Sequence, residues 1–443
     1  MGGHCGGAGR AARMRRQKHK DGVRPVSLCH QPPFVTLMTF LHRRGFTSPP
    51  LQPSLFTDTG RGLQALKAIK PGQLLVSLPE SCLLMTSTVL DSYLGSYIKS
   101  WKPRLSPLLV LCVFLVCEQH RGEASDWFPY INILPSKYSC PAYFTDDVIS
   151  VLPLTVQRRA LQQREAVREI HSSNQDFFRS LQPILSEPVN DVLTFEALRW
   201  AWCSVNTRSV FMPRPSSHFL SGPDVCALAP FLDLLNHRPD MQVSAGFCDT
   251  TRCYEIRTVS GIRRHQQAFI NYGSHDNHRL LLEYGFIAPS NPHSMVYVDT
   301  DLLCDVLRGD RSLEQKLKFL RENDFLRDLS VSADGPGWRL MTALRVLSLT
   351  QTQYPQWKAV LLGQAVCGER ERWSILTAVT LCQRLLQDSE RALDTISCLL
   401  QRCDDTVRAQ LGVVTLLRQE EKCILGSCFK ALQSSLTNPH ALP

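Results

Sequence analysis

The chain has 443 residues, a hydrophobic fraction of 44% and a mean hydropathy of −0.12, a composition that predicts a globular protein of two or three domains. Its longest apolar run, Leu108–Cys117, is about half as long as a membrane span requires, which excludes a membrane-spanning function. The net charge is +9, but residues 1–24 hold seven basic side chains and one acid, so the remainder is close to neutral. The near-neutral remainder argues against an extended nucleic-acid-binding face, so a nucleic-acid-binding protein is an alternative supported by the tail alone.

The basic N-terminal segment predicts a disordered tail over residues 1–30, rich in glycine at first and then in arginine and lysine. The string RMRRQKHK (13–20) fits a nuclear-import signal or a contact to a polyanion, and equally a solvated tail without a dedicated partner. The first 30 residues contain no apolar stretch of signal-peptide type. We therefore expect the protein in the cytoplasm and the nucleus.

Short strands are predicted next. Between residues 56 and 78, short apolar runs alternate with turn signals, first Gly60 and Gly62 and then Lys70-Pro71-Gly72. Proline at the second position and glycine at the third suit a type II turn that joins two short strands.

A long helical stretch is predicted from about residue 95 to 220. Leu108–Glu118 forms one helix, apolar residues between 156 and 185 recur at helical spacing, and Trp200 and Trp202 lie in a third helical segment. Strand character returns at 254–259, where residues alternate, and at Ala268–Asn271.

From Leu302 to the end the pattern is helical again. Ser312 and Gln315 have the spacing of a capping box that would open one of these helices. The order of elements is thus strands, helices, strands and helices, which indicates an α+β fold.

The seventeen cysteines include no Cys-x-x-Cys, and the four pairs spaced five residues apart are 112/117, 248/253, 398/403 and 423/428. Residues five apart on a helix point in different directions, so such pairs are poor tetrahedral metal ligands. We expect no metal and no disulfides, and interpret nearly all of these residues as buried, reduced thiols. Cys248 and Cys253 flank a predicted tight turn, where a metal is an alternative.

Three short motifs stand in order in the middle of the chain: DLLNH (Asp233–His237), INYG (Ile270–Gly273) and YGF (Tyr284–Phe286). Together with the glycine turn TGRGL (Thr59–Leu63), they resemble the SET-domain protein methyltransferases of the branch typified by the plant Rubisco large-subunit lysine methyltransferase. The resemblance implies a SET domain of short strands over residues 45–300, interrupted by the helical insert at about 95–220. It also implies an all-helical substrate-binding domain over 302–435.

The chemistry of this family explains why a tyrosine is needed. Methyl transfer from a sulfonium requires a neutral amine, although the pKa of free lysine is about 10.4. Burial beside the cationic sulfonium lowers that pKa, and a narrow channel lined by a tyrosine hydroxyl and carbonyls orients the lone pair and excludes water. Tyr272 matches the family's invariant tyrosine and is the predicted catalytic residue. A tyrosine of a core strand is the alternative.

The resemblance also assigns the binding site of the cofactor, S-adenosyl-L-methionine. The glycine turn would touch its methionine part, although several relatives have a glutamate where this chain has Thr59. The Asn-His pair would bind its adenine and amino-acid ends. The predicted cofactor-binding residues are Gly60, Arg61, Gly62, Arg208, Asp233, Asn236, His237, Tyr272, Tyr284 and Phe286. The alternatives are an ordinary glycine turn, a helix or turn cap at the Asn-His pair, an exposed loop arginine at 208, and core aromatics at 284 and 286.

The predicted substrate channel comprises Val210, Phe211 and Tyr284. Two residues beyond the matched arginine, lysine-modifying relatives tend to have an aromatic residue, whereas the actin-histidine-modifying relative has a polar amide. Val210 occupies that position here and offers no amide to an imidazole, which favours lysine. A shift of one residue would place Phe211 there instead.

We therefore expect an S-adenosylmethionine-dependent protein-lysine N-methyltransferase that acts on histone or non-histone proteins and uses no metal. Two alternatives stay open: the same fold acting on histidine or another side chain, and a cofactor-binding interaction module with little turnover. We expect nucleic-acid contact only through the tail, and no membrane contact.

Overall fold

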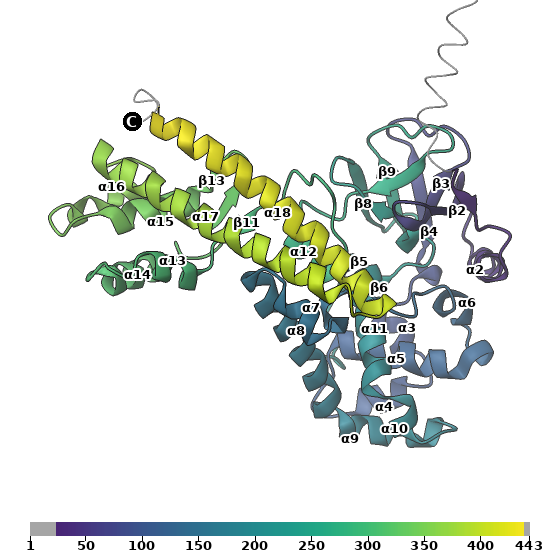
Figure 1. Cartoon of the computed structure of the whole chain (residues 1–443). Coiled ribbons are helices and arrows are strands. Elements are labelled where there is room, and N and C mark those ends of the chain that lie inside the picture. Colours follow the sequence, from purple (N-terminus) through teal and green to yellow (C-terminus); the bar gives the residue numbers. More distant parts are fainter. Residues whose placement is uncertain (1–23, 438–443) are drawn as a thin grey trace, which may run out of the picture. The chain divides into compact units, whose positions relative to one another are not determined.

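The computed structural model describes residues 24–437, which divide into two compact units (Figure 1). The first unit comprises residues 24–136 and Gln175–Tyr272, and the second comprises Lys137–Asn174 and residues 273–437. Lys137–Asn174, which the sequence placed in the insert of the SET domain, thus groups with the C-terminal helices. The tail residues 1–23, with the candidate import signal, lie outside the described residues.

The predicted disordered tail is too long at its C-terminal end. Val26–Ser27 (β1) pairs antiparallel with Leu51–Phe56 (β2). Leu28 is buried, and its backbone N–H donates to the Pro53 carbonyl at 2.9 Å. Because a buried apolar side chain and paired backbone fix this segment, residues 26–28 belong to the folded unit.

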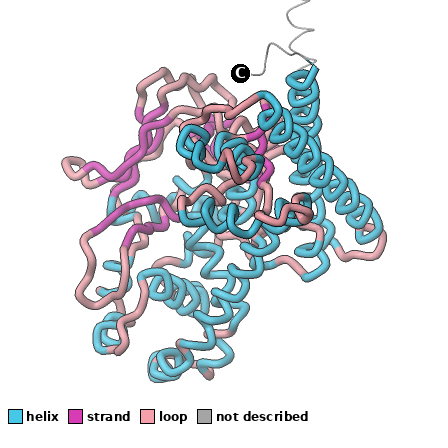
Figure 2. The backbone as a smooth tube through the Cα atoms, turned by 90° about the vertical axis from the view of Figure 1, so that its left-hand side faces the viewer, coloured by secondary structure: helices cyan, strands magenta, loops and turns pink. Residues whose placement is uncertain are grey.

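The first unit contains ten of the thirteen strands of the described residues, together with eight α-helices (strands magenta and helices cyan in Figure 2). Its strands are Val26–Ser27 (β1), Leu51–Phe56 (β2), Gly60–Ala65 (β3), Leu74–Pro79 (β4), Ser209–Arg214 (β5), Asp224–Leu228 (β6), Asn236–His237 (β7), Val243–Cys248 (β8), Cys253–Thr258 (β9) and Gln267–Ile270 (β10). Its α-helices are Pro32–Arg43 (α2), Thr86–Leu90 (α3), Gly95–Ser100 (α4), Pro107–Arg121 (α5), Phe128–Ile131 (α6), Gln175–Ser180 (α9), Val189–Val192 (α10) and Phe195–Arg208 (α11).

The strands of the first unit form three small sheets. The largest has the order β1-β2-β3-β10-β7, the second is β4-β9-β8, and β5 pairs with β6 alone. The predicted turn at Lys70-Pro71-Gly72 is confirmed: the Gln73 N–H donates to the Lys70 carbonyl at 3.2 Å, and Gly72 has a φ of 75°, as the third position of a type II turn requires.

Local signals fix the helices of the insert. Ser106 caps α5 by accepting from the Leu109 N–H, with Pro107 as its first residue, and Thr194 caps α11 in the same way. Both predicted helices are confirmed. The predicted insert reached about residue 220, but its last helix ends at Arg208 and β5 follows directly.

The second unit is mostly helical. Its α-helices are Asp146–Ser150 (α7), Leu154–Ser173 (α8), Asn277–Tyr284 (α12), Thr300–Val306 (α13), Leu313–Glu322 (α14), Trp338–Ser348 (α15), Trp357–Leu361 (α16), Gly368–Leu399 (α17) and Asp405–Thr437 (α18), and its strands are Val296–Tyr297 (β11), Ser330–Ser332 (β12) and Gly335–Pro336 (β13). The predicted architecture is all-helical, but this unit also contains the small sheet β11-β12-β13.

The two longest helices of this unit, α17 and α18, run side by side (Figure 1). Between them and α12 lies a buried ionic cluster, in which His278 Nε2 is 2.8 Å from Glu421 Oε1, and Arg418 Nη1 is 3.2 Å from Glu421 Oε2. All three residues are at most 4% exposed. Such clusters are stable only when each charge keeps its partner.

A second buried charge lies at α14. The Lys316 ammonium donates to Asp310 at 2.9 Å and to the Leu347 carbonyl at 2.7 Å. Burial alone would raise the pKa of Asp310, but hydrogen bonds from Ser312 and Lys316 hold this pKa below its ordinary value. The predicted capping box is wrong, because the Ser312 hydroxyl donates to Asp310 instead of capping α14.

No helix within residues 24–437 is both long and apolar enough to cross a membrane.

Candidate active site

Two short strands bring the sequence motifs together. β7 pairs parallel with β10, with Asn236 opposite Phe269 and His237 opposite Ile270. On its other side β10 pairs antiparallel with β3, the strand that carries the glycine turn. Because adjacent strands are about 4.8 Å apart, β3 comes close to β7 and β10, which lie some 200 residues later in the chain, at one edge of the sheet.

Asn236 holds the glycine turn in place. Its Nδ2 donates to the Arg61 carbonyl at 3.0 Å and to the Thr59 carbonyl at 3.4 Å. The Thr59 hydroxyl in turn donates to Gln267 Oε1 at 2.9 Å. The amide of Asn236 thus fixes the course of the backbone at the turn.

The two glycines of the turn are required for different reasons. Gly60 has a φ of 68°, and no heavy atom lies within 4 Å of where its Cβ would be. At Gly62 a Cβ would lie 2.4 Å from Gln267 Nε2 and 3.0 Å from Asn236 Nδ2. Gly60 therefore needs a left-handed backbone beside open space, whereas Gly62 needs the absence of a side chain.

Tyr272 follows β10 and is held at both ends. Its hydroxyl donates to the Leu235 carbonyl at 2.7 Å, and its backbone N–H donates to His237 Nδ1 at 3.0 Å. The centroids of the Tyr272 and His237 rings lie 5.2 Å apart. Because Nδ1 of His237 accepts a hydrogen bond, the neutral imidazole carries its proton on Nε2. A phenol oxygen that donates its proton can also accept a hydrogen bond.

Arg208 contacts Asp233, the buried carboxylate that begins the Asp233–His237 motif. Arg208 ends α11 and donates to the Asp233 carbonyl at 3.1 Å, and its Nη1 lies 3.6 Å from Asp233 Oδ2. Tyr130, which no sequence motif identified, donates to the same carboxylate oxygen at 3.0 Å. Burial raises the pKa of Asp233, and Arg208, Tyr130 and Arg61 oppose that shift.

The polar groups around Asp233 and the glycine turn fit a polar, charged small molecule. Within the described residues, Asp233 Oδ1 is buried and has no hydrogen-bond partner, and the Gly60 turn faces open space. Asn236, His237, Arg208 and the glycine turn supply amide, imidazole, guanidinium and backbone groups in this part of the first unit. These groups suit the amino-acid and nucleoside ends of a ligand such as S-adenosylmethionine, and none of them requires a metal. Among the described residues, no three His, Cys, Asp or Glu side chains are grouped so that they could hold a metal ion.

The predicted channel residues Val210 and Phe211 lie on β5 rather than in a loop. Val210 pairs with Ala227 and Phe211 with Cys226 across β6. The Phe211 side chain is 70% exposed, and its carbonyl accepts from the Tyr254 hydroxyl at 3.4 Å. Tyr254 is thus a further residue at this strand that sequence motifs did not identify.

Tyr284 and Phe286 belong to the second unit. Tyr284 ends α12, Gly285 follows with a φ of 78°, and the Tyr284 ring stacks on His275 at 6.0 Å. The Ser139 hydroxyl donates to the Gly285 carbonyl at 2.6 Å. The structure does not gather these aromatics in one unit with Tyr272, so their role as a pocket or channel wall stays a prediction.

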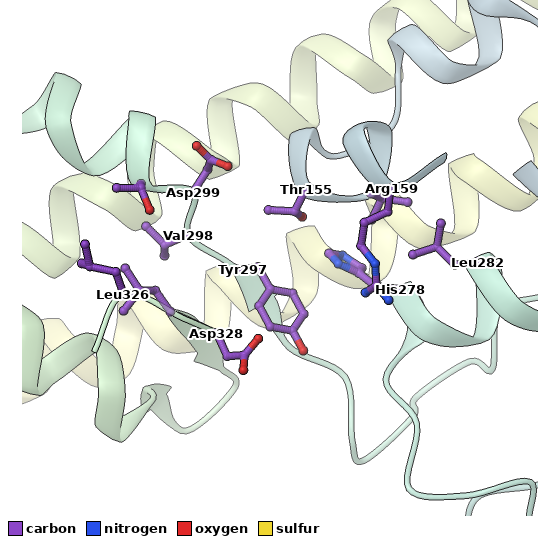
Figure 3. Close-up of a pocket in the computed structure, with 12 residues that line it drawn as sticks. Thr155, Arg159, His278, Leu282, Tyr297, Val298, Asp299, Leu326 and Asp328 are labelled. Carbon is purple, nitrogen blue, oxygen red and sulfur yellow. The ribbon is translucent and has the colours of Figure 1, made fainter. Parts of the chain in front are cut away.

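A cavity of about 230 Å³ lies within the second unit (Figure 3). The ring of Tyr297 lies between Asp328 on one side and Arg159 on the other, and Leu282 and Val298 provide apolar surface. It contains none of the predicted site residues. Because its walls carry opposite charges, it indicates no single class of ligand.

Two family models match the chain, that of the SET domain over residues 60–273 and that of the Rubisco LSMT substrate-binding domain over residues 308–425. SET domain-containing protein 4 of Mus musculus is 44% identical over 431 residues, covering 97% of this chain and 98% of that protein. The Homo sapiens protein of the same name is 42% identical over 435 residues, covering 97% and 99%. The actin-histidine N-methyltransferase of Drosophila melanogaster is 28% identical over 331 residues, covering 71% and 60%.

Solved structures of similar fold include the SET domain of LSMT bound to lysine and AdoHcy, with a TM-score of 0.63 and 19% identity, covering 93% of both chains. The structure of Rubisco LSMT bound to AdoMet has a TM-score of 0.61 and 19% identity, covering 93% of this chain and 94% of that one.

Proposed function

The chain belongs to the SET-domain family and carries a substrate-binding domain of the Rubisco LSMT type, and on this premise we propose that it is an S-adenosylmethionine-dependent protein-lysine N-methyltransferase. The observation that carries the proposal is the fixed position of Tyr272. Its hydroxyl donates to Leu235 and its backbone to His237, on the strand edge that also holds Asn236 and the glycine turn.

The cofactor would be held by residues of the first unit. The glycine turn with Arg61, the Asn236–His237 strand, and Arg208 with Asp233 supply the backbone, amide and charged groups for it. When bound, S-adenosylmethionine supplies an electrophilic methyl group on a sulfonium. That Rubisco LSMT was solved with AdoMet, and the SET domain of LSMT with AdoHcy, supports this choice of cofactor.

Tyr272 would position the attacking amine. Donating its own proton to the Leu235 carbonyl fixes the phenol, so its oxygen can accept a hydrogen bond from the neutral lysine amine. Orientation of this kind contributes most when water is excluded from the amine. Loss of the hydroxyl should therefore reduce turnover far more than cofactor affinity.

Two observations favour lysine over histidine. Val210 offers no hydrogen bond to an imidazole, and its pairing with Ala227 fixes it in register on β5. Structures of similar fold were solved with lysine and methyllysine bound. Histidine stays the second candidate because actin-histidine N-methyltransferases, such as the Homo sapiens enzyme at 25% identity, are among the relatives.

The test is transfer of a labelled methyl group from S-adenosylmethionine to whole-cell protein extract and purified histones, with the modified residue located by mass spectrometry. We expect label on lysine, and at least about a 100-fold lower rate for Tyr272→Phe with a cofactor Kd within about threefold of the wild type. Tyr354→Phe, in the second unit, is the matched control and should retain full activity.

Label on histidine would support the second candidate. Equal turnover in Tyr272→Phe would remove the role of its hydroxyl. Cofactor binding without transfer would favour an interaction module.

We further propose that the enzyme works in both cytoplasm and nucleus, on histone or non-histone proteins. The support is the basic segment 1–24. A fluorescent fusion lacking residues 1–24 should lose its nuclear fraction relative to the full chain. Unchanged nuclear signal would show that the segment is not an import signal.

A further inference from the structure

Two cysteines face each other at the tip of a hairpin in the first unit. β8 and β9 pair antiparallel along their length, and Cys248 lies directly opposite Cys253 (β8 and β9 in Figure 1). Directly opposite residues of an antiparallel pair project from the same face of the sheet. Both thiols are free and partly exposed. The sequence interpretation of nearly all cysteines as buried is wrong here, since only seven of the sixteen described cysteines are buried.

The turn between them favours a thiolate at Cys248. The Thr251 side chain and the backbone N–H groups of Thr250 and Thr251 form hydrogen bonds with Cys248 and lower its pKa. Cys253 Sγ donates to the Thr251 carbonyl at 3.3 Å, so both sulfurs lie against the same turn residue. Cys248 is therefore the better nucleophile of the two, and Cys253 is its partner across the hairpin.

A second close pair, in the second unit, is buried. Cys382 Sγ and Cys428 Sγ are 3.7 Å apart, but both residues are at most 1% exposed between α17 and α18. The hydrogen bond with Cys428 and burial raise the pKa of Cys382. Burial also raises the pKa of Cys117 to about 12. The hydrogen bond with Cys382 lowers the pKa of Cys428. Exposure, which lets an oxidant reach the sulfur, therefore selects Cys248 and Cys253 over the buried pair.

We propose that Cys248 and Cys253 form a reversible redox site whose oxidant is a hydroperoxide such as hydrogen peroxide. The Cys248 thiolate attacks one peroxide oxygen, the O–O bond breaks, and the products are a sulfenic acid at Cys248 and, after protonation, one water. The Cys253 thiol then attacks the Cys248 sulfur, forming the S–S bond and expelling the sulfenic oxygen as a second water. Overall, two thiols are oxidised to one disulfide and one peroxide is reduced to two waters.

The backbone already satisfies the geometry of this bond. Directly opposite residues of an antiparallel pair have Cα atoms about 4.5 or 5.5 Å apart, and a disulfide requires about 4.4 to 6.8 Å. Only side-chain rotation is then needed. Because the bond would be partly exposed at a hairpin tip, thiol reductants can reach and reverse it.

The experiment exposes the full-length wild-type protein to increasing hydrogen peroxide and then maps disulfides without reduction. Trypsin cleaves after Arg252 and chymotrypsin after Phe247, so the two cysteines fall on separate short peptides that stay joined only by a disulfide. We expect the 248–253 link to appear at the lowest peroxide dose, before any 382–428 link, and to disappear with dithiothreitol. This measurement needs no variant, so a folding defect cannot confound it.

Two variants assign the roles. Cys253→Ser should accumulate sulfenic acid at Cys248, trapped by dimedone, at a level at least about ten times that at Cys253 in Cys248→Ser. Preferential oxidation of the exposed Cys398 or Cys423 without a 248–253 link would overturn the proposal, as would earlier formation of the 382–428 link. Equal trapping in the two variants would overturn the assignment of Cys248 as the nucleophile.

Discussion

Replacing Gly62 with alanine should weaken cofactor binding, whereas replacing Gly72, in the turn that precedes β4, should cost stability alone. A Cβ at residue 62 would lie 2.4 Å from Gln267 Nε2, 3.0 Å from Asn236 Nδ2 and 3.2 Å from Phe56 Cδ2. The Gln267 amide can rotate away. The Asn236 amide cannot move without loosening its bonds to the Arg61 and Thr59 carbonyls, at 3.0 and 3.4 Å.

The magnitude follows from these two bonds. A net hydrogen bond is worth about 1 kcal/mol, so losing one or both costs about 1–2 kcal/mol. If that cost appears as disorder of the turn that receives the cofactor, the Kd for S-adenosylmethionine rises about 5- to 30-fold. The two hydrogen bonds of Asn236 thus determine how much the Kd rises in Gly62→Ala.

Gly72→Ala is the matched control, because it adds the same methyl group in open space outside the proposed cofactor site. Its φ of 75° makes an alanine cost roughly 1–2 kcal/mol in backbone strain, with no atom nearby to displace. Calorimetric titration with S-adenosylmethionine and thermal unfolding of each variant separate the two effects. Gly72→Ala should lower the Tm and keep the Kd within about twofold. A folded Gly62→Ala variant with wild-type Kd would refute the role given to Asn236.

Two further predictions concern the second unit. Glu421→Gln should lower the free energy of unfolding by about 2–4 kcal/mol, because it removes the buried carboxylate from His278. In chemical denaturation, the half-buried neighbour Glu420→Gln, whose Oε1 can still accept from the Ser290 N–H, should change it by less than about 1 kcal/mol. Asp310→Asn should cost about 1–2 kcal/mol at pH 7, because the buried Lys316 ammonium loses its counter-charge. Since the folded pKa of Asp310 is lowered, its contribution is present above about pH 4 and is lost as the pH falls through that pKa, so variant and wild type should converge in acid. A difference that persists at low pH would contradict this account.

Much of the fold could be predicted because its signals are local. The turn at Lys70-Pro71-Gly72 follows from the backbone preferences of two residues, and α5 follows from Pro107 and a run of apolar residues. Strand β9 follows from its alternation, since Tyr254, Ile256 and Thr258 are all buried. In each case residues adjacent in sequence decide the structure, so tertiary contacts only confirm it.

The features that sequence missed depend on contacts that local patterns do not reveal. Tyr130 donates to Asp233, which lies 103 residues away, and nothing in the sequence around Tyr130 marks it. Ser312 had the spacing of a cap, but a nearby carboxylate takes its hydroxyl, and local spacing cannot show that competition. The spacing of Cys248 and Cys253 was visible, but only the register of β8 and β9 shows that they face each other.

The register of β5 also decides how far the substrate argument can be carried. As a loop residue, Phe211 could replace Val210 by a shift of one position. As part of a strand, Ser209, Val210 and Phe211 each have a fixed partner on β6, ahead of the register shift that follows Phe211, and neighbouring side chains project from opposite faces. A one-residue shift would therefore break the pairing at Ala227 and turn every side chain of the strand to the other face. If this strand lines the channel, the residue beside the substrate is valine or the exposed Phe211, and neither can donate a hydrogen bond to an imidazole. The proposed preference for lysine therefore holds whichever of the two residues faces the substrate.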